Sequence, residues 1–83
     1  MILQATRDLN HASLAKASGS HVEIHKQAGG RRVVYYIPDT PEINQLLEKY
    51  ERRELLPLPA KCILNAKTTL YHMTAAVLRG DEI

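Results

Sequence analysis

The chain has few of the features that staple or anchor a small protein. It carries a single cysteine, Cys62, so no disulfide can form within it. No apolar run approaches the ~20 residues that a membrane-spanning helix needs. Arg7 and Asp8 follow the apolar start too closely for the apolar region of a signal peptide. The sequence therefore predicts a cytoplasmic protein with no membrane contact.

Metal-binding spacings are also missing. His21 and His25 would lie ~13 Å apart along one strand, and Cys62 and His72 would lie ~15 Å apart along one helix. Both separations are too long for a shared ion. The chain contains neither His-Glu-x-x-His nor paired cysteines. We therefore expect no metal and no cofactor.

Catalytic patterns are equally sparse. The serines at residues 13–20 are typical of helix-capping and turn positions. A chain of 83 residues leaves little room for a nucleophile, an orienting acid, an oxyanion hole and a cleft. Gly29-Gly30 matches neither a phosphate-binding loop nor a dinucleotide fingerprint, and Cys62 is better explained by packing. The sequence predicts a protein that is not an enzyme.

What is present is the composition of one small globular domain. Apolar residues make up 45% and charged residues 24% of the chain, and the net charge is only +2. We expect a single domain over residues 1–83, with an ordered core over about 6–79 and a tail at 80–83. So mild a charge does not by itself indicate a nucleic-acid partner.

Helix signals divide the chain into three helical segments. The first is expected at residues 6–18, capped by Thr6 and ended by Gly19. The second begins at Pro41 behind Thr40, a favourable cap followed by a favourable first helical residue. The third is expected at residues 60–78, where apolar residues recur at three-then-four spacing.

Between the first two helices, residues 21–26 and 31–37 alternate as strands do, and Gly29-Gly30 is typical of a hairpin turn. A turn centred on Gly29-Gly30 pairs Ile24 with Tyr35, and one centred on Ala28-Gly29 pairs it with Val33. The predicted fold is α+β, helix–β-hairpin–helix–helix, with a two-stranded antiparallel sheet packed on the helices. The expected core consists of Val22, Ile24, Val33, Tyr35, Ile37, Ile43, Leu46, Leu47, Tyr50, Ile63, Leu70, Met73 and Val77.

Several short motifs follow one another along the chain. They are Thr6-Arg7-Asp8-Leu9, Gly19, the hairpin, the helix start at residues 39–42, Leu46-Leu47-x-x-Tyr50 and Pro59-Ala60. This pattern resembles a family of small uncharacterised prokaryotic and phage domains, over about residues 6–70. The resemblance implies a reusable domain with the same order of elements. It implies no activity, because the family has none assigned.

Two interpretations of function follow from the surface. The first is a non-enzymatic module for protein–protein contact or self-association, because the third helix and the back of the hairpin carry more apolar side chains than one small core needs. Its candidate contact residues are Val34, Tyr36, Ile63, Leu70, Met73 and Val77. The third helix could equally be central to its own domain, between the hairpin and the second helix.

The alternative is nucleic-acid binding by the basic hairpin tip, with Lys26, Arg31 and Arg32 as candidate residues. Two-stranded ribbons enter nucleic-acid grooves, and arginine suits phosphates and guanine edges. Tyr36 and Val34 could add stacking or apolar contact. The same charges could instead protect a sheet edge from aggregation, as lysine and arginine on edge strands commonly do.

Overall fold

The computed structural model describes residues 2–27 and 32–80, and these form a three-stranded antiparallel sheet with three helices. The strands are β1 (Leu3–Thr6), β2 (Glu23–Lys26) and β3 (Val33–Pro38), in the order β1-β3-β2. Because β1 and β2 both run antiparallel to β3, they are parallel to each other, and α1 (Leu9–Ala17) connects them as a split β-α-β unit. The α+β class is confirmed, but the expected two-stranded sheet is wrong, because β1 was not anticipated.

The hairpin adopts one of its two expected registers. Ile24 lies opposite Tyr35, as a turn centred on Gly29-Gly30 requires. Beyond the ladder, the Gln27 amide donates to the carbonyl oxygen of Arg32 at 3.0 Å. The turn itself lies outside the described residues, as does the predicted tail beyond Gly80.

The start of α1 differs from the expectation. Asp8, not Thr6, caps the helix, and its Oδ1 accepts from the amide of Asn10 at 2.8 Å. Thr6 belongs to β1, where it lies opposite Tyr35, and its hydroxyl accepts from the amide of Asp8. Thr6, the expected cap of the first helix, is therefore the last residue of β1 instead. At the other end, Gly19 has the expected positive φ of 92°.

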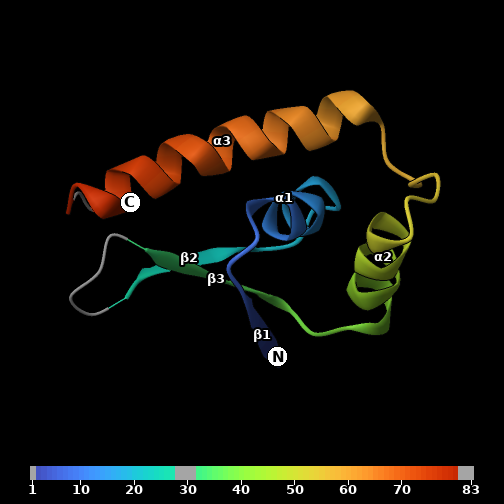
Figure 1. Ribbon diagram of the computed structural model, residues 1–83, viewed down its shortest axis with the longest axis horizontal. Helices are drawn as coiled ribbons and strands as arrows, with labels where there is room; N and C mark the ends of the chain where they lie inside the picture. The colour runs from blue at the N-terminus through green and yellow to red at the C-terminus, as the bar shows by residue number, and fades with distance from the viewer. Residues whose placement is uncertain (1, 28–31, 81–83) are drawn as a thin grey trace.

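The centre of the molecule is α1, which lies between α3 (Ala60–Leu78) and the sheet (Figure 1). Four consecutive residues, Ala12 to Ala15, are buried, so both sides of this short helix are covered. Small side chains let α3 and β3 approach it closely. The expected core contained no residue of α1, and this omission was wrong.

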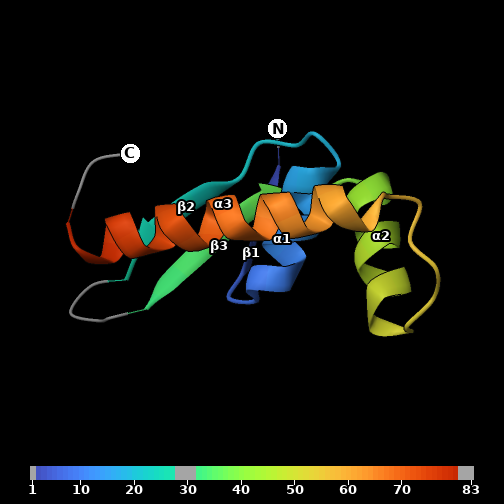
Figure 2. The same cartoon turned by 90° about the horizontal axis from the view of Figure 1, so that it is seen from above.

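The two other helices have the expected starts. In α2 (Pro41–Glu51), the Thr40 hydroxyl accepts from the amide of Ile43, and Pro41 opens the helix. The third helix has its predicted bounds and crosses over α1 and the hairpin (Figure 2). It therefore packs on α1 rather than on α2. Among the described residues, no helix has both the length and the apolarity needed to cross a membrane.

The expected core residues from the sheet are mostly buried, with Ile37 fully so. Ile43, Leu46 and Leu70 from the helices are buried as well, whereas Tyr50 and Ile63 are only half-buried. Strand β1 extends the folded part to Leu3, N-terminal to the expected start at residue 6. Most of the core thus lies between α3 and one side of the sheet. Helix α1 occupies this space together with side chains from α3 and the strands.

Candidate functional site

The two sides of the sheet have different surroundings. Helices α1 and α3 both lie on one side, and α2 stands beyond the end of β3 (Figure 1). No helix of the described residues covers the other side. Since side chains alternate along a strand, the register assigns this uncovered side, here called the open face, a defined set of strand residues. They are Leu3, Ala5, Glu23, His25, Val34, Tyr36 and Pro38.

The centre of the open face is aromatic and apolar. Tyr36 and Val34 project from the central strand and are half-buried. The ring of His25 meets that of Tyr36 edge-on, with centroids 5.0 Å apart and planes at 88°. Glu23 fixes this histidine from the same strand, with Oε1 at 3.1 Å from Nε2. Two aromatic rings are therefore held in edge-to-face contact on the uncovered side of the sheet.

Cationic side chains border these rings. Arg7 follows β1 and Arg32 precedes β3, and the alternation of both strands places them on the open face. A shallow hollow of about 290 Å³ lies there, lined by Ala5, Thr6, Arg7, Gln27, Val34 and Tyr36. Within residues 2–27 and 32–80, neither guanidinium forms an ion pair. As far as these described residues are concerned, both charges are available to an anionic ligand.

The basic hairpin tip is not a single cluster. Lys26 lies opposite Val33, so it points to the helix-covered side of the ribbon, whereas Arg32 belongs to the open face. Arg31 lies outside the described residues. The structure therefore assigns Lys26 and Arg32 to opposite sides of the ribbon, and it assigns Arg32 to the same side of the sheet as Arg7, which the sequence did not single out.

The candidate contact residues of α3 face the core. Leu70 is fully buried, so its expected role in a contact surface is wrong. Met73 and Val77 are half-buried and pack on the core cluster, and Ile63 is also half-buried. The exposed large apolar side chains of this helix are instead Leu64 and Tyr71, each 63% exposed.

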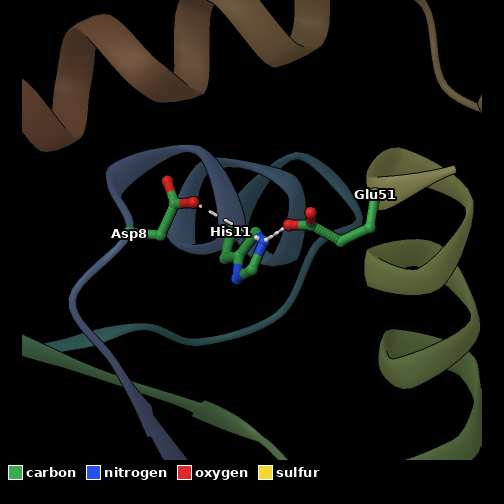
Figure 3. A group of neighbouring side chains, drawn as sticks. All are labelled: Asp8, His11 and Glu51. Carbon is green, nitrogen blue, oxygen red and sulfur yellow. Dashed lines mark hydrogen bonds and ion pairs between the residues drawn. The ribbon is translucent and has the colours of Figure 1, made fainter. Parts of the chain in front are cut away.

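A third group of side chains joins the ends of two helices (Figure 3). Asp8 and His11 come from the start of α1, and Glu51 is the last residue of α2. One ligand atom from each lies within 4.8 Å of the others. The imidazole Nε2 of His11 lies 2.6 Å from Glu51 Oε1 and 3.6 Å from Asp8 Oδ2. Sequence reasoning missed this group, because 40 residues separate His11 from Glu51 and no spacing motif links them.

In comparisons with known proteins, no family model, no curated protein and no solved structure matches this chain. The resemblance to small prokaryotic and phage domains stays a prediction.

Proposed function

We propose that the protein is a non-enzymatic binding module whose open face binds single-stranded nucleic acid. The observation that carries this proposal is the combination of Tyr36 and His25 with Arg7 and Arg32 on the uncovered side of one sheet. Stacking on aromatic rings together with cations that follow the phosphates is how proteins bind single strands. The surface of a sheet presents such rings to unstacked bases.

The chemistry of the open face matches the parts of a nucleotide. A base stacks on the half-buried ring of Tyr36 or packs on Val34, and the adjacent hollow accommodates part of a nucleotide. The guanidinium groups of Arg7 and Arg32 donate to phosphate oxygens. Glu23 is the only acid among the strand residues of this face, and it pairs with His25. The face is therefore cationic on balance.

Protein contact is the second candidate, and a different surface favours it. Leu64 and Tyr71 of α3 border an apolar hollow of about 240 Å³ together with Leu9 of α1. Exposed apolar groups of this kind mark contact surfaces. A second copy of the chain is the simplest occupant. Light scattering that shows only monomer at ~100 μM, well above ordinary micromolar affinities, would eliminate self-association.

The nucleic-acid proposal is tested by titrating fluorescent oligothymidine and oligouridine with the protein and measuring anisotropy. Tyr36→Leu is expected to weaken binding about 5- to 150-fold, because stacking is worth ~1–3 kcal/mol per base. Tyr71→Leu is the matched control, since Tyr71 is an exposed tyrosine on α3. The control is expected to bind as the wild type does. No binding by the wild type, or equal losses in both variants, contradicts the proposal.

A further inference from the structure

The group formed by Asp8, His11 and Glu51 has the chemistry of a metal site. We propose that these three side chains bind one divalent first-row transition ion, with Zn²⁺ as the reference ion. This replaces the expectation of no metal, which considered only His21, His25, Cys62 and His72 as ligands. The proposal is independent of the open face, because none of the three ligands belongs to it.

The fold positions each ligand separately. Asp8 is held by its capping bond, since Oδ1 accepts from Asn10 and leaves Oδ2 directed at His11. His11 stands one turn along α1, and its ring meets Tyr50 edge-on at 5.7 Å between centroids. Glu51 reaches across from the end of α2. The capping hydrogen bond therefore orients the Asp8 carboxylate, and the ring of Tyr50 orients the His11 imidazole.

The charges of the group are unbalanced. The Nε2 atom of His11 holds at most one hydrogen, and its hydrogen bond goes to Glu51. Asp8 Oδ2, at 3.6 Å, is too far for a second one. Two carboxylates thus face one ring nitrogen with a single hydrogen between them. A divalent cation at this point neutralises both carboxylates, and a neutral imidazole then offers its lone pair.

The donor set selects the class of ion. One imidazole nitrogen with two carboxylate oxygens suits zinc and neighbouring transition metals, whereas magnesium and calcium prefer oxygen alone. Bonds of ~2.0–2.2 Å place tetrahedral ligands ~3.3–3.6 Å apart. The present atoms lie within 4.8 Å of one another, so the ligand atoms need to move by only ~1 Å. Water completes the coordination, as in open three-ligand sites.

The test titrates the protein with Zn²⁺ by calorimetry, and with Co²⁺ by visible absorption, in a Cys62→Ser background that removes the exposed thiol. One ion per chain is expected. His11→Asn is expected to weaken binding at least ~100-fold, since even loss of an outer partner costs 10–100-fold. Glu51→Gln is expected to weaken it at least tenfold; its side chain is 61% exposed, so the variant should fold normally.

Matched controls separate this site from ordinary surface binding. His72→Asn changes an exposed histidine of α3, and Glu54→Gln changes an exposed carboxylate just beyond α2. Both are expected to bind Zn²⁺ within twofold of the parent. Circular dichroism checks that each variant is folded. No binding by the parent at millimolar Zn²⁺, or binding that Glu51→Gln leaves unchanged, overturns the proposal.

Discussion

Two neighbouring tyrosines of β3 show how the two sides of the sheet differ. Tyr35 is 4% exposed, and its hydroxyl lies 2.8 Å from that of Thr74 on α3, so it joins sheet to helix. Tyr36 faces the other way, is half-buried and meets only the ring of His25 edge-on among the described aromatic residues. Of these two adjacent residues, Tyr35 thus stabilises the fold, whereas Tyr36 forms part of the open face.

The difference indicates where mutations should act. Side chains on the covered side pack against α1 and α3, so their loss should reduce the free energy of unfolding. Side chains on the open face have no helix over them, so their loss should change binding and leave stability nearly intact. The first two pairs of variants below each compare one position from either side.

The largest effect is expected for Ile37→Ala, because Ile37 is fully buried on the covered side. Its replacement should reduce the free energy of unfolding by ~2–5 kcal/mol. Val34→Ala, on the open face, should cost ~1 kcal/mol or less. Urea unfolding followed by circular dichroism measures both. Equal losses would show that the open face is packed as tightly as the core.

A smaller effect is expected from removing the two tyrosine hydroxyls. Tyr35→Phe should cost ~0.5–1.5 kcal/mol, because the Thr74 hydroxyl, which itself donates to the carbonyl oxygen of Leu70, loses the hydrogen bond that it accepts from Tyr35. Tyr36→Phe should change stability by less than ~0.5 kcal/mol, since no described side chain bonds its hydroxyl. The same unfolding assay applies, and a larger loss for Tyr36→Phe would reverse the assignment of the two sides.

The smallest effect on stability, and a specific effect on binding, is expected for Arg32→Gln. Stability should stay within ~0.5 kcal/mol of the wild type. Loss of one phosphate contact should reduce the slope of log affinity against log salt by ~1. Lys67→Gln on α3 is the control and should leave the slope unchanged. Anisotropy titrations at several salt concentrations measure this, and identical slopes would remove Arg32 from the binding face.

The sequence predicted correctly those helix starts and ends that depend on residues close together in the chain. The Thr40-Pro41 start of α2 and the bounds of α3 were both predictable, because caps, proline and apolar periodicity act within a few residues. The hairpin register was one of two options, and alternation alone assigned Tyr35 and Tyr36 to opposite sides.

Features that depend on distant partners were not predictable. Residues 3–6 form a strand only because β3 offers an edge to pair with, and four residues carry little alternation. The buried run in α1 lacks a single apolar stripe because both of its sides are covered. The grouping of Asp8 and His11 with Glu51 depends on how α2 stands against α1, and no local pattern encodes that.

The central claim is that the open face, and not α3, receives the ligand. Its most direct test is to map amide chemical-shift changes by NMR while oligouridine is added to the labelled protein. Shifts concentrated at Ala5, Gln27, Val34 and Tyr36, with Leu64 and Tyr71 unchanged, are the predicted result. Shifts concentrated at Leu64 and Tyr71, or none at saturating oligonucleotide, would contradict it.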